Sequence, residues 1–255
     1  MFSEERKTKI LEYVQKYARA SVPELAELFQ VSESTVRRDL KELEDEKLIK
    51  RTHGGAIPIE GVNFEPTFQE KEDRYSKEKE MIAKKATDFI EEGDTILLDS
   101  GTTIYYLVKE LKRFNRLTVV TNSLVFAQEL QDIKGIEVII IGGSLRKETL
   151  ALVGPFAEQS LSMIKVDKAF IATNGIDLKE GITTPNLLEA ATKRRMIQSA
   201  KQVILLTDHS KIGKVAFAKV ADLQEIDKYV IDDGISESVV KQLNDLGVDL
   251  YLVST

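Results

Sequence analysis

The stretch SESTVRRDLKELEDE, Ser32 to Glu46, decides how the N-terminal part of the chain folds. Ser32 can accept a hydrogen bond from the first turn of a helix, so the stretch predicts a helix that ends near Glu46. At about 100° per residue, this helix has an apolar face and, nearly opposite, a basic and hydrogen-bonding face. The apolar face holds Val36, Leu40 and Leu43, the opposite face holds Ser34, Arg37, Arg38 and Lys41, and Asp39, Glu42 and Glu46 are expected between them.

Two shorter amphipathic segments precede this helix. Ser21 can cap the second of them, which begins near Pro23, a residue that is tolerated in a first helical turn. Two short helices, a tight turn and a third helix form the helix-turn-helix pattern. The apolar positions at helical spacing are Ile10, Leu11, Val14 and Tyr17 in the first segment and Leu25, Leu28 and Phe29 in the second.

A short β-hairpin is expected directly after the third helix. Residues 48–51 alternate like a strand, His53-Gly54-Gly55 supplies a turn, and Ala56-Ile57 can start the return strand. The glycines allow positive φ and a close approach of backbone amides to phosphate. This arrangement predicts a wing beside a helix-turn-helix.

The alternative is that the basic helix face is only a solvated surface, as most charged faces are. The helix spacing, the sorted faces and the wing together favour DNA recognition. From Arg6 through Ser32–Leu40 to His53-Gly54-Gly55-Ala56, the segment resembles the DeoR family of bacterial regulators, which implies DNA recognition by residues 33–46. The expected DNA-binding residues are Ser32, Ser34, Thr35, Arg37, Arg38, Lys41, Lys50, Arg51, His53 and Gly54.

Composition limits the class of protein. The net charge is −6, but residues 1–56 hold eleven basic and eleven acidic side chains, so the N-terminal segment is neutral. The chain has no cysteine and only two histidines, which excludes a disulfide framework and argues against a zinc site, so no metal and no cofactor are expected. The charged N-terminus and the lack of a long apolar run predict a cytoplasmic protein without a membrane span.

The rest of the chain predicts a linker and a larger domain. We expect a winged helix-turn-helix domain at residues 3–58, a linker at 59–75 in which Phe64 and Phe68 can dock on either domain, and an α/β effector domain at 76–255. Strands and helices alternate in the last segment, which indicates an open parallel sheet. The apolar run 138–141 is typical of a buried parallel strand. Strands are expected at 95–98, 117–120, 137–141, 166–172, 202–206, 228–232 and 249–253.

Ligands of such folds collect at the carboxyl ends of the strands, and three ends here are polar. Asp99-Ser100-Gly101-Thr102-Thr103 precedes a helix and can bind an anion through backbone amides, although an ordinary helix cap is the alternative. Asn122 can bind a sugar hydroxyl or merely cap a helix. Arg146 follows two glycines and can bind phosphate bidentately or remain a surface charge.

Further polar residues follow in order. Glu189 and Lys193 lie one helical turn apart and can equally be a surface ion pair. His209 is expected to be structural or solvent-facing. The motifs D-S-G-T-T, T-N, G-G-S-L-R, N-G-I-D, E-x-x-x-K-R and D-H-S-K resemble the DeoR effector domain in order. The resemblance implies a fold related to ribose-5-phosphate isomerase and a bound phosphosugar, held by Asp99, Ser100, Gly101, Thr102, Thr103, Asn122, Arg146, Asp177, Glu189, Lys193 and Lys211.

The sequence therefore predicts a transcriptional repressor of a sugar-catabolism operon that is relieved by a phosphorylated sugar. Its expected partners are operator DNA and that sugar, with fructose 1-phosphate as the first candidate and glycerol 3-phosphate and tagatose 6-phosphate remaining open. A homodimer or homotetramer is expected, because one recognition helix reads only a half-site. Activation instead of repression stays open. The alternative is an active sugar-phosphate isomerase with Glu189 as base, but residues 181–186 depart from the expected glycine-rich loop.

Overall fold

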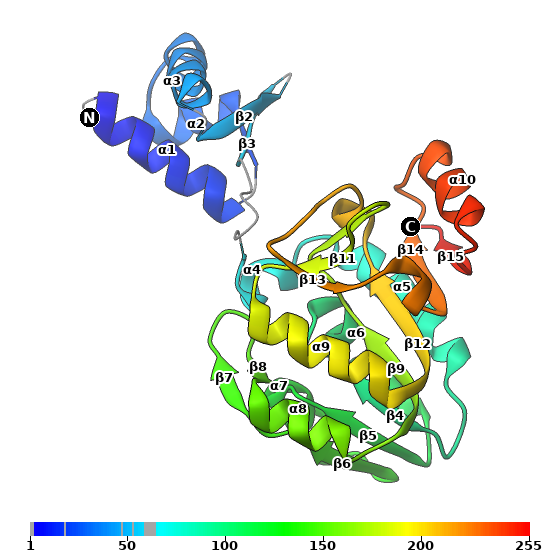
Figure 1. Ribbon diagram of the computed structural model, residues 1–255. Helices are drawn as coiled ribbons and strands as arrows, with labels where there is room; N and C mark the ends of the chain where they lie inside the picture. Colours follow the sequence, from blue (N-terminus) through cyan, green and yellow to red (C-terminus); the bar gives the residue numbers. More distant parts are fainter. Residues whose placement is uncertain (1–2, 18, 47, 53, 59–64) are drawn as a thin grey trace. The chain divides into compact units, whose positions relative to one another are not determined.

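The computed structural model describes residues 3–17, 19–46, 48–52, 54–58 and 65–255. The chain comprises two compact units, Met1–Gly61 and Val62–Thr255 (Figure 1). Within the described residues, no helix is long and apolar enough to cross a membrane.

The first unit combines three helices with a small antiparallel sheet of strand order β1-β3-β2. The caps predicted at Ser21 and Ser32 are confirmed, since each hydroxyl accepts a hydrogen bond from the backbone amide three residues later, at 3.3 and 3.2 Å. The predicted hairpin is also confirmed. The elements are α1 (Ser3–Tyr17), β1 (Ala20–Ser21), α2 (Val22–Phe29), α3 (Glu33–Asp45), β2 (Ile49–Thr52) and β3 (Gly55–Pro58).

The core of the first unit lies between the three helices. Val36, Leu40 and Leu43 of α3 are buried, as the periodicity predicts. The prediction is wrong for Tyr17 and Leu28, which are 49% and 52% exposed, because each lies in the last turn of its helix, where the neighbouring helices no longer cover it.

The sequence suggested that Asp39 lies between the two faces of the helix. Asp39 is instead fully buried. Its carboxylate accepts hydrogen bonds from Nε and Nη2 of Arg6 at 2.6 and 3.0 Å. A buried charge is tolerated when it is paired in this bidentate way. The pair therefore ties α1 to α3.

Gly55 has a packing role that the sequence did not indicate. It lies in β3 opposite Ser21 of β1, and a Cβ added there would stand 1.9 Å from the Ala20 carbonyl oxygen. The positive φ expected for the wing glycines is not found at Gly54 or Gly55. Gly55 is needed because the two strands approach closely.

The second unit is built on a seven-stranded parallel sheet of order β15-β14-β12-β9-β4-β5-β6, which confirms the α/β fold class. Each of the seven strands overlaps one predicted from the sequence. They are β4 (Thr95–Leu98), β5 (Leu117–Thr121), β6 (Ile136–Ile140), β9 (Val166–Ile171), β12 (Ala200–Thr207), β14 (Lys228–Asp232) and β15 (Leu250–Val253).

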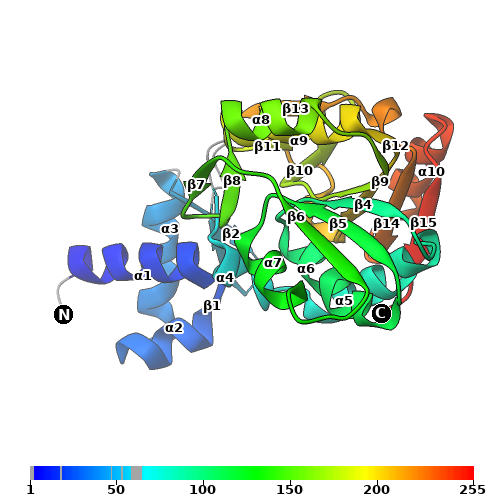
Figure 2. The same cartoon turned by 90° about the horizontal axis from the view of Figure 1, so that it is seen from below.

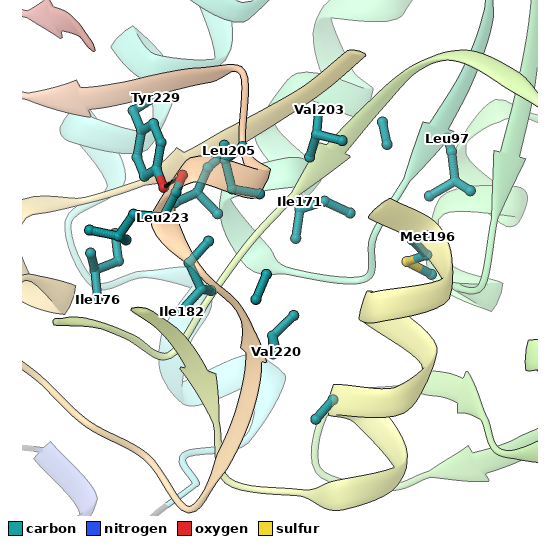
Figure 3. Close-up of a cluster of buried hydrophobic side chains, with 14 of the residues drawn as sticks. Leu97, Ile171, Ile176, Ile182, Met196, Val203, Leu205, Val220, Leu223 and Tyr229 are labelled. Atoms are coloured by element: carbon teal, nitrogen blue, oxygen red, sulfur yellow. Dashed lines mark hydrogen bonds between the residues drawn. The ribbon is translucent and has the colours of Figure 1, made fainter. Parts of the chain in front are cut away.

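Helices cover both faces of this sheet. In Figure 2, α8 (Pro155–Ser162) and α9 (Leu187–Ser199) lie on one side, and α5 (Ser76–Ala86), α6 (Thr102–Glu110) and α7 (Leu124–Leu130) lie on the other. Because side chains alternate along a strand, Leu97 of β4 joins the cluster under α8 and α9, whereas Ile96 and Leu98 join the opposite one. Figure 3 shows Leu97 in the first cluster with Met196 of α9.

β6 forms an edge of the sheet, which corrects the expectation of a buried strand. It pairs with β5 alone, and Ile139 and Ile140 are 41% and 46% exposed. A continuous apolar run therefore did not distinguish a central strand from an edge strand here.

Smaller elements complete the second unit. Two small antiparallel sheets have the orders β7-β8 and β10-β11-β13. The remaining helices and strands are α4 (Phe68–Glu72), η1 (Thr87–Phe89), η2 (Leu111–Arg113), β7 (Ser144–Arg146), β8 (Ala151–Val153), β10 (Gly175–Asp177), β11 (Gly181–Thr184), η3 (His209–Lys211), β13 (Ala218–Ala221), η4 (Leu223–Glu225) and α10 (Glu237–Asp245).

The segment before α5 packs on the second unit. Phe68 is 5% exposed, its ring meets Tyr105 edge-on at 5.8 Å, and its amide donates to the Glu148 carbonyl at 2.7 Å. Thr67 and Glu70 form a capping box at the start of α4. Phe68 thus docks on the second unit, whereas Phe64 lies outside the described residues.

Candidate functional site

The basic face of α3 is exposed. Ser34, Arg37, Arg38 and Lys41 are all solvent-accessible, while Asp39 is turned into the protein. The guanidinium of Arg37 donates to the Glu33 carboxylate at 3.2 Å, and Arg38 is exposed on the same helix. The face that points away from the core therefore carries positive charge and hydroxyl donors, the groups that bind phosphates and base edges.

The wing adds a second exposed basic region. Lys50, Arg51 and Gly54 are exposed, while His53 lies outside the described residues. Glu44 of α3 accepts from Nε and the backbone amide of Arg51, at 2.6 and 2.9 Å. Arg51 thus fixes the wing to α3, a role that the sequence did not suggest.

In the second unit, the loop after β4 reaches the start of α6. Ser100, Thr102 and Thr103 are buried. Gly101 is the N-cap residue of α6, and because glycine has no side chain it cannot cap the amides of the first turn. A Cβ at Gly101 would stand 2.3 Å from Cβ of Ala172, so glycine is required there. Uncapped amides at a helix start favour an anion.

Asp99 directly follows β4 and contacts α9. Its carboxylate contacts the ammonium of Lys193 and accepts the Ala172 amide at 2.9 Å, and Lys193 also donates to the Ala172 carbonyl at 3.1 Å. The Asp99 and Lys193 side chains are 1% and 8% exposed. Lys193 therefore does not form the surface pair with Glu189 that its spacing allowed.

Glu189 is buried one turn earlier in α9. It accepts from the Thr149 hydroxyl, from Thr184 Oγ1 at 3.2 Å, and from Nη1 of Arg146 at 3.2 Å. Burial opposes ionisation, but Lys193, Thr149 and Arg146 outweigh it and hold the pKa of Glu189 below its ordinary value. Glu189 is thus an ionised acceptor, unlike a general base whose pKa is raised toward neutrality.

Arg146 lies among carboxylates. Glu65 binds it bidentately, at 2.6 and 3.1 Å, and Glu148 stands 3.4 Å away. The Arg146 and Glu65 side chains are 14% and 8% exposed. Arg146 is therefore part of the buried cluster and not a plain surface charge.

Asn122, at the end of β5, is 2% exposed. Its Nδ2 donates to the Leu152 carbonyl at 3.1 Å, while its Oδ1 has no hydrogen-bond partner among the described residues. A buried acceptor without a partner costs free energy, which a ligand hydroxyl would recover.

Two lysines of the preceding segment join this region, although the sequence reasoning did not select them. Burial lowers the pKa of Lys71, opposed by Glu189 and Glu65 and assisted by Lys211. Burial also lowers the pKa of Lys79 to about 8. Lys79 donates to the Lys71 and Glu72 carbonyls, the latter at 3.4 Å.

Asp177 and His209 have local roles. The Asp177 carboxylate accepts the amides of Lys179 and Glu180 at 2.8 and 3.0 Å, which closes the β10–β11 hairpin and lowers its pKa. Among the residues that the structure describes, these hydrogen bonds join Asp177 to the hairpin and not to the Asp99–Glu189 cluster. His209 Nδ1 meets Asp232 at 2.6 Å, as expected of a structural histidine.

Two family models match the chain. A DeoR-like helix-turn-helix domain covers residues 6–61, and a DeoR C-terminal sensor domain covers residues 74–233. The chain belongs to the DeoR family of transcriptional regulators. This membership confirms the resemblance seen in the sequence, and it identifies the chain as a regulator and not an isomerase.

Relatives align over nearly the whole chain. The uncharacterized regulator YulB of Bacillus subtilis is 39% identical over 99% of this chain and 98% of its own length. The repressor GlcR of the same organism is 39% identical over 99% and 97%. The uncharacterized regulator FruR of B. subtilis is 35% identical over 88% of each chain.

Among solved structures, a D-ribose-5-phosphate isomerase in complex with phospho-erythronic acid matches at a TM-score of 0.40 and 18% identity, over 54% of each chain. Within the described residues, no group of three or more histidine, aspartate or glutamate side chains is arranged to hold a metal ion.

Proposed function

We propose that this DeoR-family protein represses a sugar-catabolism operon and releases its operator when a phosphorylated sugar binds the second unit. The observation that supports the sensing function is the buried Asn122 Oδ1, which has no partner among the described residues. Asn122 directly follows β5, beside the strand β4 that Asp99 follows, and its Nδ2 donates to Leu152 of β8, the strand that pairs with Arg146 in β7. A phosphorylated sugar has hydroxyl groups that can donate a hydrogen bond to this oxygen. Its phosphate carries the negative charge that the arginine and lysine side chains attract.

Operator recognition is assigned to the exposed face of α3 and to the wing. Ser34, Arg38 and Lys41 would face the major groove, with Ser32, Thr35 and Arg37 at the same end of the helix. Lys50, Arg51, His53 and Gly54 would lie along the neighbouring backbone. Because one such helix reads a half-site, we propose that a homodimer or homotetramer binds a two-fold symmetric operator.

We propose that the phosphosugar binds at the carboxyl ends of the parallel strands. Residues 99–103 and Arg146 would hold the phosphate, while Asn122 and Glu189 would bind hydroxyls. Lys71, Lys193 and Lys211 add positive charge to the same neighbourhood. Asp177 would bind a further hydroxyl through Oδ2, since the two backbone amides of the hairpin bond to its Oδ1.

The test uses the purified full chain and a duplex selected from a random DNA library. Melting temperature is measured against a panel of phosphorylated sugars, with fructose 1-phosphate first. A ligand at ~100 times its Kd stabilises the native state by about 2.7 kcal/mol. A shift with one compound, together with release of the selected duplex, supports the proposal; release without a shift, or a shift without release, contradicts it.

A further inference from the structure

Glu65 binds the guanidinium of Arg146, the group that we propose for the phosphate of the ligand. Its two carboxylate oxygens lie 3.1 and 2.6 Å from Nη1 and Nη2 of Arg146, a bidentate pair across 81 positions of sequence. Both side chains are nearly buried, so the pair is little screened by water. A guanidinium binds a carboxylate and a phosphate through the same fork of donors.

Glu65 lies near the start of the second unit, three residues before α4. The described residues of that unit begin here, and Phe68 is a separate buried anchor beside it. The Phe68 anchor consists of its buried ring and its amide bond to the Glu148 carbonyl, neither of which involves Arg146. Glu65 is thus a second attachment point that can be lost while Phe68 stays in place.

Glu189 also faces Arg146, but it is fixed differently. Thr149 and Thr184 donate to its carboxylate, and it lies in the body of α9. Glu65 lies outside the helices and strands, three residues before α4. Of these two acidic partners, Glu65 is therefore the one that an incoming anion can displace at smaller structural cost.

We propose that Glu65 competes with the effector phosphate for Arg146, and that its displacement releases the start of the second unit from Arg146 and thereby signals to the DNA-binding unit. This inference rests on the proposed function, since it presumes that the cluster binds a phosphate ester. A ligand shifts a conformational equilibrium only through different contacts in the two states. Exchange of Glu65 for phosphate on one guanidinium is such a difference.

The experiment compares Glu65→Gln with wild type in the full chain. Fructose 1-phosphate and inorganic phosphate are titrated by calorimetry, and release of the selected duplex is followed by fluorescence anisotropy. Without the competing charge, affinity for the phosphate should rise about tenfold, and half-release should need about tenfold less ligand. The matched control is Glu148→Gln, a more exposed carboxylate 3.4 Å from the same guanidinium, whose affinity should stay within about twofold.

Repeating the comparison in an Arg146→Ala background separates competition from a structural effect. If Glu65 acts through Arg146, the gain from Glu65→Gln disappears there. A gain that persists, or equal affinity of Glu65→Gln and wild type, overturns the inference and leaves the proposed function standing. A wild-type protein that binds neither inorganic phosphate nor any sugar of the panel refutes both.

Discussion

Lys193 and Asp99 are 94 residues apart in sequence and meet as a buried ion pair where α9 crosses the end of β4. The pair also engages both backbone groups of Ala172, just after β9. One ammonium group therefore joins three elements at the carboxyl ends of β4 and β9, and the candidate site is formed by the same contacts that stabilise the fold.

Replacing Lys193 with methionine should lower the free energy of unfolding of the second unit by about 3–5 kcal/mol, because the Asp99 charge stays buried without its partner. Denaturant unfolding followed by circular dichroism measures the change. Lys201→Met is the control, since Lys201 pairs with Asp167 at an exposed position and should change stability little. Equal stability of the two variants would contradict the structural role of the pair.

Lys79 should make stability depend on pH. Its pKa is about 8 in the folded protein, against an ordinary value of 10.5, because burial disfavours the ammonium. Between these values the unfolded chain binds the extra proton, so stability rises with pH and the rise is complete above 10.5. Relative to Lys79→Met, wild type should gain about 3 kcal/mol from pH 8 to 10.5.

Unfolding free energies of wild type and Lys79→Met at several pH values test this. The other titrating groups are shared by the two proteins, so the difference between the two curves isolates Lys79. Parallel curves would show that the amine does not titrate in this range.

Arg38→Ala should weaken operator binding by about 10- to 100-fold at matched salt, since a lost base or phosphate contact costs about 1–3 kcal/mol. The melting temperature of Arg38→Ala should equal that of wild type, both without and with fructose 1-phosphate. Arg195→Ala, an exposed arginine of the second unit, is the control and should bind operator normally. Normal binding by Arg38→Ala would exclude α3 as the recognition helix in this register.

Asn122→Ala should reduce phosphosugar affinity about tenfold, because a ligand hydroxyl would lose its acceptor. Stability should change by no more than about 1 kcal/mol, since the variant loses the bond to Leu152 but also removes a buried oxygen that lacks a described partner. Calorimetry and denaturant unfolding of the same preparation separate the two effects. Unchanged affinity would place the ligand away from Asn122.

Local patterns predicted much of the fold. A serine directly before an amphipathic helical pattern predicted the N-caps Ser21 and Ser32. Apolar runs of strand length predicted the seven strands of the sheet. The exposure of Ile139 was not predictable, because a strand's own residues do not reveal whether a neighbour lies on both sides. The burial of Asp39 was not predictable for a similar reason, because its partner Arg6 lies on another helix.

The candidate site was predictable where motifs follow strands, as at Asp99 and Asn122. Lys71 and Glu65 were missed because their segment lacks periodicity and their partners are distant in sequence: Glu65 meets Arg146 across 81 positions. Asp177 was predicted as a ligand residue through family resemblance, and that remains a prediction. The sequence did not indicate that its Oδ1 also accepts the amides of Lys179 and Glu180 in the turn.

The buried pair of Arg6 and Asp39 has a consequence for genetics. A screen for colonies that express the controlled operon constitutively would recover changes at both residues beside changes at Arg38, although Asp39 is sealed inside the first unit. The two kinds of mutant would differ in abundance. Loss of Arg38 leaves a full complement of folded protein, while loss of either partner of the pair leaves less, because cells degrade domains whose folded fraction falls.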